Sequence, residues 1–378
     1  MVKYALLDRI ICVIIEVEEK TFLKEIRPME KKLRYAIVGC GNFGKQHLDA
    51  IMTVSGIEVV ALCDIHIESC EKRKEEFGLS ANCYTDHKEM LKCEKIDVVT
   101  VASSDKAHKE ATVDSLRAGC HVLCEKPMAL FTEECEEMVK AADESGKLLM
   151  VGQVCRYAPG FVKAKSLVEK GVIGELYFVE SEYAHDYLGR EGVDGWRADK
   201  DREPIIGGAC HAIDLLRWIA GDPIETSAYS NHKMLKSWPV NDTTVAIMKF
   251  PGDVIGKVFT SIGCKRDYTM RTVLYGTKGT IIVNNTDPYL TLYLDKIEGA
   301  PFADGQLEGT EEKLIRHLIK VSINNHNVAA EHRQMLDSVL NGTPLITTGR
   351  EGARTVAVCR AVVESAKTGM PVKIKYTV

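Results

Sequence analysis

The sequence has no CxxC pair, although it contains 13 cysteines. Without that spacing, neither a zinc ribbon nor a thioredoxin-type motif is indicated, and an odd number of scattered thiols suits a reducing cytoplasm. Long apolar runs are also absent, and residues 10–17, the longest run near the start, are too few to span a bilayer. With a net charge of −5 and no basic stripe, the chain is not expected to bind nucleic acid or a membrane.

The composition that remains is that of a soluble globular protein, with 45% hydrophobic and 27% charged residues. A chain of 378 residues is long enough for two domains. Residues 1–29 end at a second methionine, Met29, just before the first good strand. No small-residue cleavage site follows the early apolar run, so a signal peptide is not expected. We expect residues 1–29 to be an extension outside the fold.

A strand, a glycine-rich turn and a helix follow one another from residue 33. Residues 33–38 are rich in β-branched and aromatic side chains and predict a buried parallel strand. A second strand, 57–63, ends at Asp64. Between the two strands, a turn with G-x-G-x-x-G spacing leads into a helical stretch and contains Gly39, Gly41, Asn42, Phe43 and Gly44. This order of elements is typical of dinucleotide binding, and the alternative is a purely structural βα turn.

Each part of this arrangement has a mechanical reason. The first glycine allows a tight turn, the second lets a pyrophosphate approach the backbone, and the third lets the helix pack closely on the strand. Asp64 can accept hydrogen bonds from both ribose hydroxyls. Its carboxylate would repel a 2′-phosphate, so NAD is predicted as the cofactor and NADP is less favoured, although His66 and Arg73 lie nearby.

Strands and helices continue to alternate up to residue 152, which predicts a doubly wound parallel sheet in residues 30–152. Within this region, Glu125-Lys126-Pro127 directly follows a strand. In open α/β sheets the carboxyl ends of the strands are where ligands bind. Lys126 is therefore expected to face the cofactor crevice rather than to be a solvated loop lysine.

The pattern of predicted strands and helices changes in residues 153–378. Residues 224–294 are mostly strand-like runs separated by the turn signals PGD and GTKG, which indicates a largely antiparallel sheet. Residues 320–368 return to a helical pattern, and residues 371–378 are expected to close as a strand. The predicted architecture is a Rossmann α/β domain followed by an α+β domain.

These motifs resemble the glucose–fructose oxidoreductase / inositol dehydrogenase / MocA (Gfo/Idh/MocA) family. The resemblance covers about residues 33 to 375 and rests on these segments: AIVGCGNFGKQH, CDIH, HKEATVDSLRAGCHVLCEKPMAL, VGQVCRYAPGF, GVIGELYFVE, GWRAD and GGACHAIDLLRWIAG. It implies NAD(P)-linked oxidation or reduction of sugars, cyclitols or related polyols. It also implies an open-faced sheet that carries the substrate and forms the contact of a homodimer or homotetramer.

Two positions depart from the family pattern. The family usually has Thr-Pro in a loop that lines the cofactor, where this chain has Ser103-Ser104, and His108 is expected near the same loop. The family often has an aspartate four residues before its catalytic histidine. Aligned on His211, that position is Gly207. The acid that would orient His211 must therefore come from elsewhere or be absent.

Hydride transfer from a carbinol needs a base for the hydroxyl proton and an oriented donor carbon. Lys126 is the candidate that hydrogen-bonds the reacting oxygen, and His211 is the candidate that takes or gives the proton, since histidine titrates near neutral pH. The alternative for His211 is a core histidine, because the helix that it opens has an apolar face. Glu125 is expected to hold Lys126 or the nicotinamide ribose. Asp214, three residues after His211, could orient the imidazole or could pair with an arginine.

Other candidates for substrate contact follow from their places in the predicted loops: Arg156, Tyr157, His185, Asp186, Trp196 and Arg197. Each could instead be ordinary packing. A metal is not expected, because Cys120, His121 and Cys124 are strand neighbours on alternating faces and cannot easily converge as zinc ligands.

Three functions remain open at this stage. The leading one is an NAD-dependent dehydrogenase acting on a sugar, cyclitol or glycoside hydroxyl. The second is an enzyme that uses bound NAD transiently to oxidise C3 and eliminate a glycosidic substituent, so that turnover needs no added cofactor. The third is a non-catalytic NAD(H)-binding regulator, against which the presence of both Lys126 and His211 argues.

Overall fold

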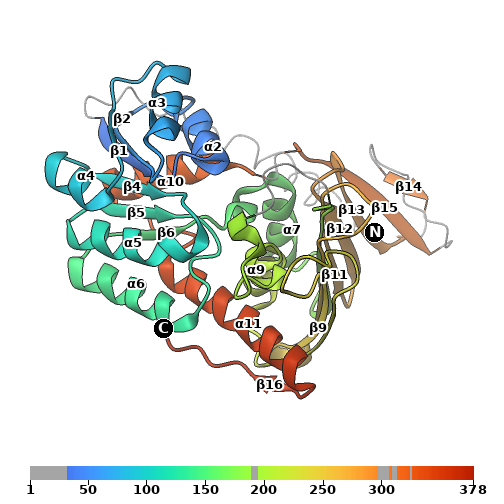
Figure 1. Cartoon of the computed structure of the whole chain (residues 1–378). Coiled ribbons are helices and arrows are strands. Elements are labelled where there is room, and N and C mark those ends of the chain that lie inside the picture. Colours follow the sequence, from blue (N-terminus) through green and yellow to red (C-terminus); the bar gives the residue numbers. More distant parts are fainter. Residues whose placement is uncertain (1–31, 189–194, 297–305, 309–312, 324–325) are drawn as a thin grey trace.

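The computed structural model describes residues 32–188, 195–296, 306–308, 313–323 and 326–378, so the extension expected at 1–29 lies outside the described residues. Two sheets stand side by side, with helices between and around them (Figure 1). No helix in the described ranges is both long and apolar enough to cross a membrane. The division into α/β and α+β regions that the sequence predicts is confirmed.

The first sheet has six parallel strands in the order β3-β2-β1-β4-β5-β6. The strands are β1 (Leu33–Val38), β2 (Ile57–Cys63), β3 (Asn82–Tyr84), β4 (Val98–Val101), β5 (His121–Cys124) and β6 (Leu149–Val151). The helices that alternate with them are α2 (Asn42–Ile51), α3 (Ile67–Glu76), α4 (His87–Cys93), α5 (His108–Arg117) and α6 (Thr132–Ser145). This is the doubly wound order, and its direction reverses between β1 and β4, where such sheets bind ligands.

The second sheet has ten described strands in the order β14-β15-β13-β12-β11-β7-β10-β9-β8-β16. They are β7 (Leu176–Ala184), β8 (Glu225–Asn231), β9 (Thr243–Lys249), β10 (Ile255–Ser261), β11 (Thr269–Gly276), β12 (Gly279–Asn284), β13 (Tyr289–Asp295), β14 (Gln306–Glu308), β15 (Leu314–Lys320) and β16 (Val372–Lys373). Among these described strands, only β7 and β10 pair in parallel, and every other neighbouring pair is antiparallel. The PGD and GTKG segments are the hairpin connections β9–β10 and β11–β12, as predicted.

Helices cover one face of this sheet. They are α7 (Pro159–Glu169), the single turn α8 (Pro204–Gly207), α9 (Cys210–Ala220) and α11 (Gly349–Thr368). The strands alternate buried and exposed positions, as in β9, because one face lies on this helical layer and the other does not. The other face, which no helix of the described residues covers, carries exposed apolar side chains, among them Tyr229, Val245, Ile247 and Ile255.

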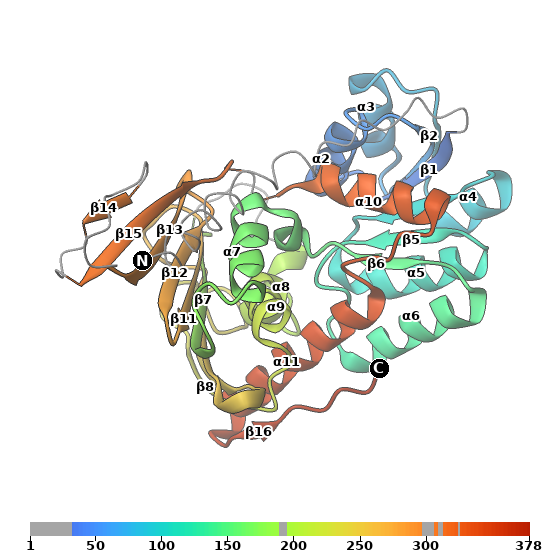
Figure 2. The same cartoon turned by 180° about the vertical axis from the view of Figure 1, so that it is seen from behind.

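Two C-terminal helices connect the sheets in space. Figure 2 shows α10 (Val328–Asn341) lying against α2 of the first domain, far from the strands that precede it in sequence. The next helix, α11, contacts α6 and β6 on one side and α9 and β8 on the other. The expected closing strand at 371–378 is shorter than predicted, because only β16 pairs, with β8.

Candidate active site

The glycine turn has the tight geometry that the motif predicts. Gly39 has φ +99°, and a Cβ at this position would lie 2.5 Å from the backbone of Ala102. A Cβ on Gly44 would lie 2.0 Å from the Gly39 carbonyl oxygen, so only glycine lets α2 start this close to β1. Around Gly41 there is open space within 4 Å. The backbone at the start of α2 is therefore open to an anion, and these residues fit a dinucleotide pyrophosphate.

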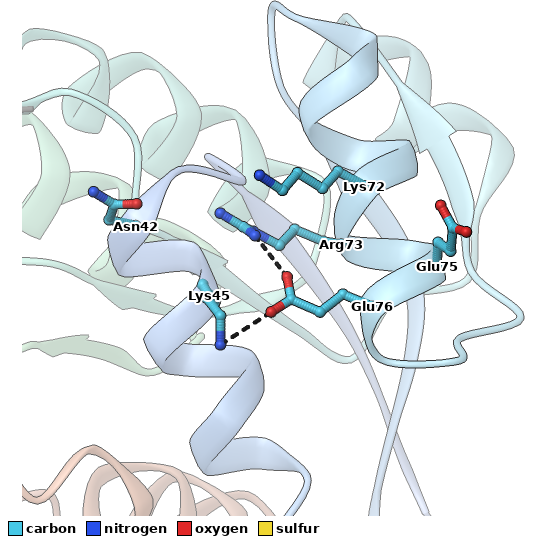
Figure 3. A pocket seen from close by; sticks show the side chains of 6 residues that line it. All are labelled: Asn42, Lys45, Lys72, Arg73, Glu75 and Glu76. Carbon is cyan, nitrogen blue, oxygen red and sulfur yellow. Dashed lines mark hydrogen bonds and ion pairs between the residues drawn. The ribbon is translucent and has the colours of Figure 1, made fainter.

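Asp64 follows β2 and faces the glycine turn. One carboxylate oxygen accepts a hydrogen bond of 2.8 Å from the Cys40 N–H, and the other accepts one of 3.0 Å from the His66 N–H. Beside the turn, a cavity of about 600 Å³ lies between α2 and α3, lined by Asn42, Lys45, Lys72, Arg73, Glu75 and Glu76. In Figure 3 Lys45 and Arg73 both reach Glu76, which holds these cations at the cavity wall.

The Glu125-Lys126-Pro127 turn lies at the carboxyl end of β5, and its Lys126–Pro127 bond is cis. Glu125 is buried, accepting hydrogen bonds from His47 Nε2 at 3.0 Å and from the Lys126 N–H at 3.1 Å. Burial opposes the charge of Glu125, but the hydrogen bond from His47 and the charge of Lys126 outweigh it and lower the pKa of the carboxyl. Glu125 thus fixes the backbone of Lys126.

Lys126 reaches from the first domain toward the second. Its ammonium lies 5.6 Å from the centre of the Phe43 ring and 3.4 Å from the carbonyl oxygen of Gly207. Gly207 ends α8, four residues before His211 in the first turn of α9. The lysine therefore bridges the glycine turn and the lead-in to the histidine helix.

His211 is buried, and its Nδ1 has no hydrogen-bond partner in the described part of the chain. Burial is the largest cause, followed by the charge of Lys126 and the neighbouring His326, and together they lower the pKa of His211 well below its ordinary value. The charge of Lys126 in the first domain thus acts on His211 in the second. His211 is neutral at pH 7 and can accept a proton.

The Arg202 guanidinium occupies the space that an acidic side chain at position 207 would need. A Cβ on Gly207 would lie 2.3 Å from both Cζ and Nη1 of Arg202. Arg202 donates from Nε to Asp105 Oδ2 at 2.6 Å and from Nη2 to the Gly207 carbonyl at 3.0 Å. Asp105 follows the altered Ser103-Ser104 loop, so this buried ion pair joins the predicted cofactor loop to the histidine helix. Arg202 and Asp105 carry no motif that would have singled them out.

Asp214 forms an ion pair with an arginine, the alternative that the sequence left open. Both its oxygens accept hydrogen bonds of 2.7 Å from Arg156, and Thr355 donates a third of 2.9 Å. Asp214 is therefore engaged away from the His211 imidazole. Arg156 and Tyr157 are also buried, and the Tyr157 hydroxyl hydrogen-bonds to Gln334 and Thr347. The structure places these predicted pocket residues in the packing between domains.

His108 connects two loops of the predicted cofactor site. Its Nδ1 lies 3.0 Å from the Pro127 carbonyl oxygen and its Nε2 lies 3.2 Å from the Ser103 carbonyl oxygen. Burial lowers the pKa of His108, but the Cys124 side chain, the Asp105 carboxylate and the Pro127 carbonyl raise it to about 10. An imidazolium can donate to both carbonyls, which ties the lysine turn to the Ser103 loop.

Among the remaining substrate candidates, His185 belongs to an aromatic group that the sequence did not reveal. The His185 ring is 4.7 Å from the rings of Tyr187 and Tyr268, and Asp186 pairs with Lys265. Trp196 is an exposed residue that lies beneath two cations, with Arg197 at 4.3 Å and Arg202 at 5.0 Å. Two further side chains complete the aromatic group around His185: Tyr183 and His326, which both contact Tyr268.

One group of possible metal ligands occurs in the described residues, and it lies on α4 and α5. His87, Glu110 and Asp114 have ligand atoms within 4.8 Å of one another. The Lys88 ammonium lies 2.7 Å from Glu110 and 3.6 Å from Asp114. The Lys88 ammonium thus already pairs with both carboxylates, so this group does not indicate a metal site.

A second buried network lies behind Glu125. His47 Nδ1 is 3.0 Å from His332 Nε2, which extends the Glu125–His47 contact into α10. Next to His332 in sequence, Glu331 is fully buried, and neither of its carboxyl oxygens has a partner among the described residues. Burial and the nearby Glu125 charge raise the pKa of Glu331 well above its ordinary value of 4.5.

We expect Glu331 to make the stability of the protein depend on pH. The folded state holds a proton that the unfolded state releases above 4.5, so the free energy of unfolding falls as pH rises from 4.5 to the raised pKa, by up to about 1.4 kcal/mol per pH unit. Glu331→Gln should remove this dependence and raise stability at neutral pH. Urea unfolding at several pH values measures it, with the exposed Glu364→Gln as the control; identical pH slopes for Glu331→Gln and the wild type would contradict the assignment.

Two sequence profiles match the chain. Residues 33–153 match the profile described as "Oxidoreductase family, NAD-binding Rossmann fold", and residues 161–282 match "GFO/IDH/MocA C-terminal domain". The chain belongs to the Gfo/Idh/MocA family of oxidoreductases. The family predicted from the glycine turn and Glu125-Lys126-Pro127 is confirmed, and the first domain is an NAD-binding domain.

Gfo/Idh/MocA relatives with known activities cover much of the chain. Inositol 2-dehydrogenase of Salmonella typhimurium (strain LT2) is 27% identical over 250 residues, which are 65% of this chain and 72% of the relative. D-glucoside 3-dehydrogenase of Escherichia coli (strain K12) is 34% identical over 197 residues, 50% of this chain and 55% of the relative. Levoglucosan dehydrogenase in complex with NADH has the same fold, with a TM-score of 0.80 at 20% identity over 91% of this chain and 100% of that chain.

Proposed function

We propose that this protein is an NAD-dependent dehydrogenase that transfers a hydride between the cofactor and a hydroxyl-bearing carbon of a sugar, cyclitol or glycoside. One observation carries the proposal. The Lys126 ammonium, which follows β5 of the first domain, lies 3.4 Å from the carbonyl oxygen of Gly207, four residues before His211 in the second domain. This contact supports a site in which a cation of the first domain and a neutral base of the second act on the same substrate group.

The two side chains suit proton transfer from a carbinol. The nicotinamide group, when bound, accepts the hydride from the carbinol carbon. Lys126 would hydrogen-bond the carbinol oxygen and favour its alkoxide form. His211, neutral because its pKa is lowered, would accept the hydroxyl proton. Glu125, held by His47, would keep the Lys126 backbone in place.

The surroundings of Asp64 support NAD over NADP. The carboxylate lies at the carboxyl end of β2 beside the glycine turn. Arg73 is held by the Cys40 carbonyl at 3.1 Å and by Glu76 at 2.6 Å. Since the nearby arginine is already neutralised, it offers little to a 2′-phosphate.

Asp64→Ser should shift the preference toward NADP⁺ by about tenfold or more, because a like charge next to the 2′-phosphate is removed. Fluorescence titration of the wild type and the variant with both cofactors measures this shift. Asp49→Ser, on the exposed side of α2, is the control. If the wild type already binds NADP⁺ more tightly than NAD⁺, the role assigned to Asp64 is wrong.

The substrate class is proposed from the relatives, which are named as dehydrogenases of inositol and of glucosides. A panel of sugars, cyclitols and glycosides, followed by NADH absorbance with and without added NAD⁺, tests it. The glucoside relative is named for position 3, which keeps transient C3 oxidation with elimination as the second candidate. Aglycone release without added NAD⁺ would favour that candidate, and binding of NAD without any turnover would favour a regulator.

We propose that the uncovered face of the second sheet joins subunits into a homodimer or homotetramer. Exposed apolar side chains from several strands lie on it, including Tyr229, Val245, Ile247 and Ile255. Such a patch on a sheet face is typical of a protein contact. Light scattering of the purified chain measures the number of subunits.

A further inference from the structure

His326 is a half-buried residue that lies next to the proposed catalytic pair. It precedes α10, and its ring centre is 6.2 Å from that of His211, with 63° between the ring planes. On another side it stacks on Tyr268, with centres 5.8 Å apart and planes inclined by only 7°. His326 is therefore held between the histidine helix and the second sheet.

The backbone around His326 is anchored. Its carbonyl oxygen accepts a hydrogen bond of 2.8 Å from the Val328 N–H at the start of α10. The next residue, Asn327, donates from Nδ2 to the Tyr157 carbonyl at 3.1 Å. The ring thus projects from a fixed point, although it sits in a short connecting segment.

The imidazole of His326 is available for hydrogen bonding. Among the described residues, no protein group hydrogen-bonds to either ring nitrogen. Burial and the Lys126 charge lower the pKa of His326, while the Glu125 carboxylate opposes them. A neutral imidazole has one donor and one acceptor, which is the pairing that a hydroxyl group satisfies.

A single carbinol does not need this second histidine. In the proposed function, Lys126 contacts the reacting oxygen and His211 takes its proton. His326 adds a further polar group beside them, and adjacent hydroxyl oxygens of a sugar ring are separated by about 3 Å, roughly the length of one hydrogen bond. Two imidazoles with centres 6.2 Å apart can each reach one of two such oxygens.

We infer that His326 is a substrate-binding residue that hydrogen-bonds the hydroxyl next to the reacting carbinol, so that the enzyme selects vicinal diols. This rests on the proposed function. The inference names a residue outside every motif of the sequence, since the histidine stands in the segment INNHNV.

The test pairs a change in the protein with a change in the substrate. The probes are methyl β-D-glucopyranoside and its 2-deoxy and 4-deoxy analogues, which lack one or the other neighbour of the C3 hydroxyl. With the wild type, one of the analogues should lose about tenfold to hundredfold in kcat/KM. His326→Ala should lose a similar factor with the parent glycoside and little more with that analogue, because both changes remove the same hydrogen bond.

Further measurements separate this role from a structural one. His326→Gln, which keeps a donor and an acceptor, should recover part of the loss, while Tm and the affinity for NAD stay unchanged. His232→Ala, in the exposed loop between β8 and β9, is the matched control. Equal losses by His326→Ala with the parent and both analogues would overturn the inference, since the histidine would then act through His211 or packing.

The outcomes also separate the inference from the proposed function. If the wild type oxidises the glucoside and His326→Ala is as active as the wild type, the inference fails and the dehydrogenase stands. If the wild type oxidises no member of the sugar, cyclitol and glycoside panel, the proposed function fails, and the inference falls with it.

Discussion

Lys126→Ala should lower kcat by about 10²–10⁴-fold, the usual contribution of a well-placed acid–base group. The ammonium bridges the glycine turn and the Gly207 carbonyl, where the reacting oxygen would lie. The affinity for NAD should change little, because the cofactor contacts that we propose are those of the glycine turn and Asp64. Steady-state kinetics and cofactor titration on the same preparation measure both effects. A large loss of NAD affinity with unchanged kcat would contradict the assignment.

His211→Ala should lower kcat to a similar extent. The pKa of His211 is lowered, so the wild-type rate should be flat at neutral pH and fall only where the imidazole becomes protonated, below the ordinary value of 6.5. The sequence alone predicts that the acidic limb of the pH–rate profile lies near neutrality. Burial and the charge of Lys126 move this acidic limb to lower pH. In the variant this acidic limb should disappear.

The double variant tests whether the two residues share one step. If Lys126 and His211 act on the same hydroxyl, the loss in Lys126→Ala/His211→Ala should be little greater than that of the worse single variant. Lys106→Ala, at an exposed lysine that pairs with Asp199 and Asp201, is the matched lysine control. Strictly multiplicative losses would show that the two side chains act in separate steps.

Arg202→Met should destabilise the protein by about 3–5 kcal/mol, because it leaves the Asp105 carboxylate buried and unpaired. Both side chains are almost fully buried, with 6% and 4% of their surface exposed. The change also removes the hydrogen bond to the Gly207 carbonyl, so the segment between Gly207 and His211 should become less well fixed. Urea unfolding measures the stability, and kcat with the best substrate of the panel reports on the site.

The partner substitution separates charge from packing. Asp105→Leu combined with Arg202→Met removes both charges, and an apolar pair in such a place is often as stable as the ion pair it replaces. The double variant should therefore recover most of the lost stability. If it recovers stability but not activity, the ion pair positions the Ser103 loop against the histidine helix. If Arg202→Met alone leaves the free energy of unfolding unchanged, Arg202 and Asp105 do not form a buried ion pair.

The local parts of the fold and site followed from the sequence. Strand β1, the glycine turn, the acid after β2 and the lysine turn are each set by a few consecutive residues. In the glycine turn, for example, Gly39 has φ +99° and a Cβ on Gly44 would lie 2.0 Å from a carbonyl oxygen, so both positions require glycine. The same holds for the hairpins, whose turn residues lie between alternating strands. Family membership rests on these local patterns.

Only the tertiary structure decided which charged and polar groups meet. Asp214 pairs with Arg156, 58 residues away, and Arg202 pairs with Asp105, 97 residues away. His332 on α10 reaches His47 over 285 residues of sequence. A side chain selects its ionic partner by burial and distance, and neither is encoded in the spacing of nearby residues. The place of His326 beside His211 has the same origin, since it depends on a helix, α10, that returns to the first domain after strands β7 to β15 of the second sheet.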